Sequence, residues 1–259
     1  MSILQEIRKY GLRLGQDKVF LIDENFLDKE VGYAQITKGD TVLEIGCGIG
    51  NLTERLVEKA GKVIAVEKDA NLAKICRVRV QAKNLEVITG DALKIALPRF
   101  DRAVSNLPYS ISAPITFRLL EQDFKTAVLV YQKEFGDKMV AQPGDSNYGR
   151  LSVMVQAKAD VELLDAIPKT CFTPVPKVDS RIIRLTPRRR DLPDNFADVV
   201  RALFQHRRKL CKNALSDSAH ELKGFDAKKS AKDVCPQKNV FKLSIEEIVQ
   251  LCKKMQAHH

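Results

Sequence analysis

The chain has few residues suited to binding a metal, and no segment suited to crossing a membrane. Its six cysteines, at positions 47, 76, 171, 211, 235 and 252, include no Cys-x-x-Cys pair, and two of its four histidines are its last two residues. Such scattered cysteines indicate reduced thiols and no metal site. No apolar run approaches the roughly 18 residues of a membrane span, and the first nine residues lack an apolar signal-peptide centre. These absences predict a cytoplasmic protein that does not contact a membrane.

The length and the charge predict a main domain with a basic appendage. The 259 residues are many for one small domain and few for two full ones, and the 44% hydrophobic content suffices for a core. The net charge of +10 is uneven, because residues 188–259 hold 16 Lys and Arg against nine Asp and Glu, which leaves +3 for residues 1–187. A basic C-terminal part suits a polyanionic partner, although a solvated lysine-rich surface has the same composition.

Short apolar runs alternate with amphipathic, helix-length segments in the first half of the chain. The runs predict strands at 41–45, 62–66, 85–88, 102–104 and 126–130. This alternation is typical of a parallel sheet with helices on both faces, so we expect an α/β fold. Asp23 is expected to cap a helix that runs to about Gln35. Residues 152–163 and 180–185 are expected to form an antiparallel strand pair at the sheet edge.

A domain boundary is expected near residue 188, where three consecutive arginines precede Asp-Leu-Pro. Beyond it, the apolar periodicity of residues 196–215 predicts one helix. Another face of that helix would carry Arg201, Gln205, Arg208 and Lys212, at spacings of three and four. We therefore expect one domain of residues 1–187 and a small, basic, helical domain of residues 188–259.

Residues 42–51, Val-Leu-Glu-Ile-Gly-Cys-Gly-Ile-Gly-Asn, predict a strand, a glycine-rich turn and the start of a helix. Glycines let the backbone approach a ligand closely, and the helix N-terminus follows them. The next strand ends at Glu67, 21 residues after Gly46, where a carboxylate can accept both ribose hydroxyls of an adenosine. The pattern fits a dinucleotide or S-adenosylmethionine. A dehydrogenase and a methyltransferase both remain open at this point.

The ends of the third and fourth strands distinguish the two. Asp91 follows the third strand, where it can accept a hydrogen bond from an adenine amine of a cofactor. Asn106-Leu107-Pro108-Tyr109 follows the fourth strand, and its Asn amide and Leu carbonyl can together hold an exocyclic amine while the tyrosine lies on the ring. Asn-Xaa-Pro alone marks a turn more often than an active site. Hydride transfer has no need of the tetrapeptide, so methyl transfer is the better account.

Together these motifs resemble the rRNA adenine N6-dimethyltransferase family, and the short C-terminal domain is most similar to archaeal members. The resemblance covers nearly the whole chain and includes residues 20–21, 131–134, 148–152, 172–180 and 204–209. It implies a Rossmann-like, mostly parallel seven-stranded sheet and S-adenosylmethionine as cofactor. It also implies dimethylation of N6 of two adjacent adenosines in the 3′-terminal hairpin loop of 16S-type rRNA, by a monomer acting on immature 30S subunits. One departure is Lys18-Val19, where the family usually has Gln-[His/Asn].

By this resemblance, the cofactor contacts are expected from Val19, Leu21, Gly46, Gly48, Glu67, Lys68, Asp91, Ala92 and Asn106. The expected catalytic residues are Asn106, Leu107, Pro108, Tyr109 and Phe172. Tyr109 and Phe172 would sandwich a base that has left its stack, although Phe172 has the sequence context of a packing residue too. The expected RNA contacts are Arg201, Arg207, Arg208, Lys209 and Lys212. A 23S rRNA methyltransferase of the antibiotic-resistance type and a non-catalytic, RNA-binding ribosome-assembly factor remain as alternatives.

Overall fold

The computed structural model describes residues 3–12, 15, 18–222, 231 and 234–257. The chain divides into two compact units, one of Met1–Gly136 with Asp160–Pro187 and one of Asp137–Ala159 with Arg188–His259. This division differs from the expected one, because residues 137–159 group with the C-terminal part. The hydroxyl of Tyr148 donates a hydrogen bond to the backbone carbonyl of Leu243 at 2.9 Å, and its ring lies edge-on to Phe204. Those contacts fix the segment within the second unit.

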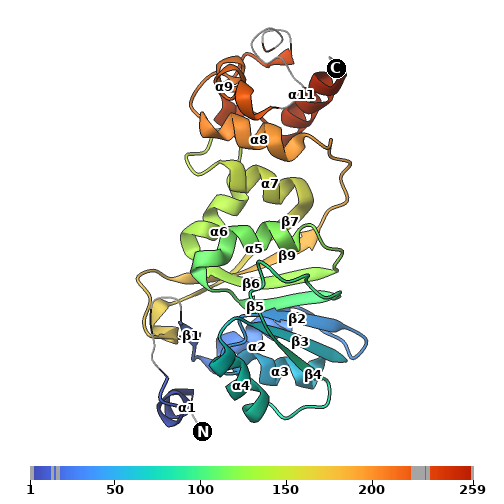
Figure 1. Cartoon of the computed structure of the whole chain (residues 1–259). Helices are drawn as coiled ribbons and strands as arrows, with labels where there is room; N and C mark the ends of the chain where they lie inside the picture. The colour runs from blue at the N-terminus through green and yellow to red at the C-terminus, as the bar shows by residue number, and fades with distance from the viewer. Residues whose placement is uncertain (1–2, 13–14, 16–17, 223–230, 232–233, 258–259) are drawn as a thin grey trace. The chain divides into compact units, whose positions relative to one another are not determined.

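A seven-stranded sheet frames the first unit, in the order β4-β3-β2-β5-β6-β9-β7 (Figure 1). The parallel strands are β2 (Thr41–Ile45), β3 (Lys62–Glu67), β4 (Leu85–Thr89), β5 (Arg102–Asn106) and β6 (Thr126–Gln132). β9 (Ser180–Pro187) runs antiparallel to β6 and lies between β6 and β7 (Ala159–Ile167). The five predicted parallel strands and the Rossmann-like α/β fold are therefore confirmed.

Helices lie on both sides of this sheet (Figure 1), which explains why β2, β3 and β6 are buried almost end to end. They include α2 (Glu24–Tyr33), α3 (Asn51–Lys59), α4 (Ala70–Arg79) and α5 (Ser112–Leu119). As expected, Asp23 caps α2, since its carboxylate accepts the backbone N–H groups of Asn25 and Phe26. This unit also contains α1 (Ile3–Lys9) and the short antiparallel pair of β1 (Phe20–Leu21) and β8 (Phe172–Thr173).

The second unit is helical, with α7 (Arg150–Lys158), α8 (Phe196–Gln205), α9 (Cys211–Asp217) and α11 (Ile245–Ala257). α6 (Lys133–Val140) crosses from the first unit into the second. Residues 152–158 form a helix, so the strand expected to begin at residue 152 is wrong for this part. The Ser152 hydroxyl donates to the carbonyl of Lys138 and accepts the N–H of Gly149, which caps α7. Within the described ranges no helix is long and apolar enough to cross a membrane.

The single helix expected over residues 196–215 is also wrong, because α8 ends at Gln205 and α9 begins at Cys211. The residues between them bond to a distant segment instead of to the preceding helical turn. The N–H groups of Val240 and Phe241 donate to the carbonyls of Lys209 and Arg207, respectively, both at 3.0 Å. These long-range hydrogen bonds occupy carbonyls that a continuous helix would have used for its own ladder.

Candidate active site

A cavity of about 560 Å³ opens in the first unit, where the loops that follow β2, β3, β4 and β5 meet. The carboxyl ends of parallel strands are the usual place for a ligand in such a sheet. Every residue expected to contact the cofactor or to act in catalysis lines this cavity, namely Val19, Leu21, Gly46, Gly48, Glu67, Lys68, Asp91, Ala92, Asn106, Leu107, Pro108, Tyr109 and Phe172. The structure therefore brings together residues that the sequence separates by up to about 150 positions.

The glycine turn is packed too tightly for side chains. Gly46 and Gly48 have φ angles of 77° and 57°, in the left-handed region that glycine adopts without strain. A Cβ on Gly48 would lie 2.7 Å from the ring of Phe20, and one on Gly46 would lie 3.3 Å from the ring of Pro108. The turn leads into α3, and Asn51 at its first position lines the cavity. A helix N-terminus in the wall favours a ligand that carries negative charge.

Glu67 is fixed at the end of β3, and its carboxylate can accept further hydrogen bonds. The N–H of Gly48 donates to its Oε2 and the N–H of Asp69 donates to its Oε1, both at 2.9 Å. The side chain is buried, with 8% of the residue exposed. Each carboxylate oxygen can accept two hydrogen bonds, so each keeps one lone pair for a ligand. The arrangement fits a pair of neighbouring hydroxyl groups.

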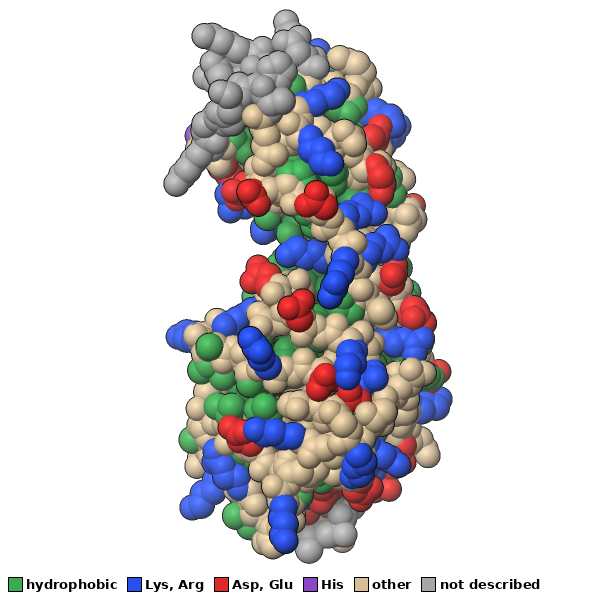
Figure 2. Space-filling model, turned by 90° about the vertical axis from the view of Figure 1, so that its right-hand side faces the viewer, with side chains coloured by type: hydrophobic (Ala, Val, Ile, Leu, Met, Phe, Trp, Pro, Cys, Tyr) green, Lys and Arg blue, Asp and Glu red, His purple; other side chains and the backbone are tan. Residues whose placement is uncertain are grey.

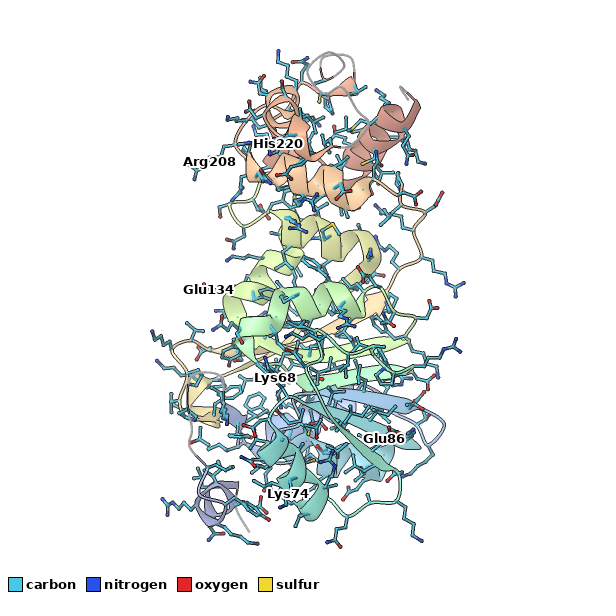
Figure 3. The ribbon with its side chains drawn as sticks, in the orientation of Figure 1. Lys68, Lys74, Glu86, Glu134, Arg208 and His220 are labelled. Carbon is cyan, nitrogen blue, oxygen red and sulfur yellow. The ribbon has the colours of Figure 1, made fainter. Side chains whose placement is uncertain are left out.

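Asp91 and Lys68 form a second polar group on the cavity wall. The Asp91 carboxylate accepts the N–H of Leu93 at 3.0 Å and pairs with the Lys68 ammonium at 3.1 Å. The backbone hydrogen bond from Leu93 and the Lys68 charge lower the pKa of Asp91, so the group is a carboxylate over the neutral range. Lys68 itself extends from the end of β3 (Figure 3). The site can thus accept a hydrogen bond from an amine.

Lys18 is a cavity residue that the sequence analysis did not single out. Its ammonium lies 2.6 Å from the carboxylate of Asp69, which caps α4 and follows Glu67 closely in the chain. The ion pair with Lys18 lowers the pKa of Asp69. Lys18 is the first residue of the Lys18-Val19 departure from the pattern of the resembled family. That departure was the sequence feature that could have pointed to Lys18. Gln16, upstream in the same segment, lies outside the described residues.

Asn106 ends β5 and presents an unusual feature. Its side-chain Oδ1 is buried and has no hydrogen-bond partner among the described residues. An unsatisfied buried acceptor costs about 1–3 kcal/mol, so a donor from a ligand would be strongly favoured there. The residue lines the cavity, and Leu107 and Pro108 follow it directly. This is the place at which the cavity best fits an exocyclic amine.

Tyr109 and Phe172 are held in different ways. The Tyr109 hydroxyl shares a hydrogen bond of 2.6 Å with the hydroxyl of Ser180, which is fully buried. Burial raises the pKa of Tyr109, so its phenol stays neutral. Phe172 is only 3% exposed and belongs to the hydrophobic core, and its β8 segment pairs with β1 through Leu21. Phe172 is therefore a packing residue that also forms part of the cavity wall.

The sequence analysis missed Glu30, a buried acid outside the cavity lining. Glu30 lies on α2 and is fully buried, and neither of its carboxylate oxygens has a hydrogen-bond partner among the described residues. The available signal was its position, because Glu30 follows Leu27 by three residues and Phe26 by four, on the apolar side of the helix. A charged residue type on an apolar face is the informative exception in such a pattern.

The residues expected to contact RNA lie in the second unit and differ in their partners. Arg201 pairs with Asp198 at 3.0 Å and with Glu221 at 3.2 Å. Within the described part of the chain, the side chains of Arg208 and Lys212 have no ion pair, and Arg208 extends away from the turn after α8 (Figure 3). Because α8 ends at Gln205, the expectation that Arg201, Arg208 and Lys212 share one helix face is wrong.

The other two basic residues of this group are held by neighbours. Lys209 pairs with Asp217 at 2.7 Å. The guanidinium of Arg207 donates to the carbonyl of Ser146 at 2.9 Å and lies over the ring of Phe241. Lys and Arg side chains are spread over the face of each unit shown in Figure 2, interspersed with Asp and Glu. The basic character of this face is thus distributed and is not confined to one patch.

Comparison with known sequences finds one consistent group of relatives. A sequence model described as ribosomal RNA adenine dimethylase matches residues 10–257. A probable ribosomal RNA small subunit methyltransferase A from Thermococcus sibiricus is 49% identical over 258 residues, which cover 95% of this chain and 94% of the relative. The protein of the same description from Methanothermobacter thermautotrophicus is 45% identical, with 96% of this chain and 94% of the relative covered.

Similar solved structures agree with these sequence comparisons. A dimethyladenosine transferase from Plasmodium falciparum superposes with a TM-score of 0.79 at 32% identity, over 91% of this chain and 96% of that one. The 23S rRNA methyltransferase ErmE superposes with a TM-score of 0.66 at 27% identity, over 92% of this chain and 99% of that one. The chain is therefore similar, along nearly its whole length, to enzymes that methylate ribosomal RNA.

Proposed function

Because the chain belongs to the ribosomal RNA adenine dimethylase family, we propose that it dimethylates N6 of two adjacent adenosines in the 3′-terminal hairpin loop of small-subunit rRNA. The chain is an S-adenosylmethionine-dependent enzyme and not a dehydrogenase. Relatives at up to 49% identity are described as small-subunit enzymes, whereas the 23S enzyme is 27% identical, which favours the small subunit as the substrate. The buried, unpartnered Oδ1 of Asn106 is the structural observation that carries the proposal.

The cavity fits S-adenosylmethionine. Its volume of about 560 Å³ falls in the range of small-molecule sites, and the glycine turn lets a ligand approach the backbone closely. Glu67 would accept the ribose hydroxyls and Asp91 the adenine amine, while Val19, Leu21, Lys68 and Ala92 line the rest of the pocket. When bound, this cofactor supplies an electrophilic methyl group on a positively charged sulfur. The phenol of Tyr109 is neutral and the Asn106 amide is uncharged, so neither side chain competes with the substrate amine as a nucleophile.

The chain's contribution to the chemistry is to orient a weak nucleophile. The N6 lone pair of adenine is delocalised into the ring, so the nitrogen attacks poorly while it stays planar. Asn106 Oδ1 and the Leu107 carbonyl would accept the two N6 hydrogens and favour a pyramidal nitrogen whose lone pair faces the methyl group. The methylated nitrogen then loses its proton readily to water, so no strong general base is needed.

Tyr109 would stack on one face of the target base, and Phe172, which also lines the cavity, would contact the other face. Such a sandwich requires the nucleotide to leave its stack, and stacking on an aromatic ring repays part of that cost. The hydrogen bond shared by the hydroxyls of Tyr109 and Ser180 would hold the Tyr109 ring at a fixed angle. Arg201, Arg207, Arg208, Lys209 and Lys212 are the proposed phosphate contacts, with Arg208 and Lys212 the most available of them.

We further propose that the substrate is the immature 30S subunit in the cytoplasm and that the enzyme acts as a monomer. The decisive experiment is transfer of radiolabelled methyl groups onto 30S particles from a strain that lacks the enzyme, followed by mapping of the modified nucleotides. Label on two adjacent adenosines near the 3′ end of the small-subunit rRNA is the expected result. Label on naked 23S RNA would favour the antibiotic-resistance type. Tight 30S binding with no methyl transfer would favour a non-catalytic assembly factor.

A further inference from the structure

Arg79, the last residue of α4, is a largely buried cation next to the glycine turn. Its side chain is only 10% exposed, and it is not among the residues that line the cavity. One of its nitrogens, Nη1, donates to the carbonyl of Ile49 at 2.9 Å and to Oδ1 of Asn51 at 2.8 Å. Ile49 lies inside the glycine turn, between Gly48 and Gly50, and Asn51 lines the cavity. The guanidinium therefore contacts the turn without entering the site that the turn forms.

Two acids on other helices hold the same guanidinium. Its Nη2 donates to the Glu54 carboxylate on α3 at 2.6 Å, and its Nε lies 2.5 Å from the Glu6 carboxylate on α1. The Glu6 side chain is 13% exposed, and its neighbour Ile7 packs in the hydrophobic core. Ion pairs shielded from water are stronger than exposed ones, and the planar guanidinium can serve several acceptors at once. Arg79 is thus held firmly enough to fix the groups to which it donates.

The contact with Asn51 determines the orientation of that amide. An arginine side chain donates hydrogen bonds and cannot accept them, so only the oxygen end of the amide suits this contact. The NH₂ end is then the donor that Asn51 can offer to a ligand in the cavity. The turn itself also packs against the end of α4, where a Cβ on Gly50 would lie 2.8 Å from the side chain of Val80. The end of α4 therefore shapes this part of the cavity wall.

We propose that Arg79 is a positioning residue for the cofactor: it holds the glycine turn and the Asn51 amide in the arrangement that receives S-adenosylmethionine. Glycines allow close approach of a ligand but leave a turn many conformations, so a clamp from outside keeps it in one of them. A site that is ordered before binding has a higher affinity, because the ligand does not have to order it. This inference rests on the proposed function, since it takes the cavity to be the cofactor site.

The test compares Arg79→Met with the wild type in the full-length protein. Methionine keeps an unbranched side chain at this position but donates no hydrogen bond. The dissociation constants for S-adenosylmethionine and S-adenosylhomocysteine, measured by calorimetry, should rise about tenfold. The KM for S-adenosylmethionine should rise by the same factor, whereas kcat at saturating cofactor and the KM for 30S particles should stay at wild-type values. A merely structural role would not separate these quantities.

Arg102→Met is the matched control. Arg102 is 15% exposed, donates to the carbonyl of Ala34 at 2.8 Å and pairs with Asp40 at 2.9 Å. It begins β5, at the opposite end of the strand from the cavity. Its replacement should lower the melting temperature, because the buried Asp40 loses a partner, but S-adenosylmethionine should bind with wild-type affinity. An equal loss of affinity in both variants would attribute the effect to general destabilisation and would overturn the inference.

Asn51→Ala keeps the test decisive if Arg79→Met does not fold. It removes one group that Arg79 holds and leaves the ion pairs with Glu54 and Glu6 in place. The affinity for S-adenosylmethionine should fall about three- to tenfold, and adding Arg79→Met should weaken binding by less than the sum of the two effects, because the residues act together. Wild-type affinity in either variant, or fully additive losses, would overturn the inference. If the wild-type protein itself bound no S-adenosylmethionine, the proposed function would fail instead.

Discussion

The polar side chains of the cavity in the first unit are fixed by neighbours, whereas, among the described residues, two of the basic side chains in the second unit are not paired. In the cavity of the first unit, backbone N–H groups fix Glu67 and Asp91, and a buried hydroxyl holds Tyr109. In the second unit, Arg208 and Lys212 are free of ion pairs within the described ranges. Fixed groups suit a reaction that depends on angles and distances, whereas unpaired cations suit phosphates, which attract them over several ångströms in any orientation. A substitution in the cavity should therefore affect catalysis, whereas a substitution of these cations should affect only the affinity for RNA.

Asn106→Ala would give the sharpest test of the fixed region. We expect methyl transfer to fall by about 10²- to 10³-fold or more, because one preorganised acceptor of the reacting group is removed. The fold and the affinity for S-adenosylmethionine should persist, as shown by circular dichroism and calorimetry. Asn71→Ala, at an exposed position on α4, is the matched control and should keep full activity. A rate near that of the wild type in purified Asn106→Ala would contradict the acceptor mechanism.

Glu67→Ala should act on the cofactor and not on the chemical step. A hydrogen bond to a charged acceptor contributes about 1.5–3 kcal/mol, so affinity for S-adenosylmethionine should fall tenfold or more. Isothermal titration calorimetry measures this directly. Glu86→Ala, which removes an exposed carboxylate on β4 (Figure 3), is the control and should bind with wild-type affinity. Unchanged affinity for S-adenosylmethionine in Glu67→Ala would mean that Glu67 does not contact the cofactor.

The double variant Arg208→Ala with Lys212→Ala probes the unpaired cations of the second unit. The affinity for 30S should fall. The slope of log affinity against log salt concentration should become shallower by up to about 2, because each lost cation removes one phosphate contact and the counterion that this contact releases. Arg201→Ala should change the slope much less, since Asp198 and Glu221 already hold its guanidinium. Cofactor affinity should not change in any of these variants. If the salt slope of the double variant matched that of the wild type, these side chains would be merely solvated.

Glu30→Gln should reveal a smaller, pH-dependent effect on stability. Burial raises the pKa of Glu30 above its unfolded value, so the folded state binds more protons than the unfolded state between those two pKa values. The wild type should therefore lose stability relative to Glu30→Gln as pH rises through this window, by up to about 1.4 kcal/mol per pH unit. Melting temperatures of both proteins across pH 5–8 measure the difference. A constant difference would mean that Glu30 is charged in the folded protein.

Much of the first unit was predictable because its signals are local. The apolar runs that became β2 to β6 are bounded by turns, and the glycine turn and the tetrapeptide follow strands directly. All predicted cofactor and catalytic positions line one cavity, since the topology of a parallel sheet gathers its strand ends. Their individual roles stay proposals. Ser180 was missed because its partner, Tyr109, lies far away in the chain.

The second unit was less predictable because long-range contacts decide its local structure. Residues 152–158 are rich in β-branched and apolar side chains, and short apolar runs do not distinguish a strand from a buried helix. Caps and burial within the unit select the helix. Likewise, the apolar periodicity continues past Gln205, but hydrogen bonds to residues 240 and 241 end α8 there. No sequence pattern within residues 196–215 predicts those hydrogen bonds.

The second unit is assembled from two separate stretches of chain, and this has a consequence for exchanging parts between related enzymes. A chimera joined once at residue 187 would pair the foreign C-terminal helices with the native residues 137–159. Tyr148 would then face an unmatched neighbour in place of Leu243 and Phe204. A successful graft must therefore transplant residues 137–159 and the C-terminal stretch together.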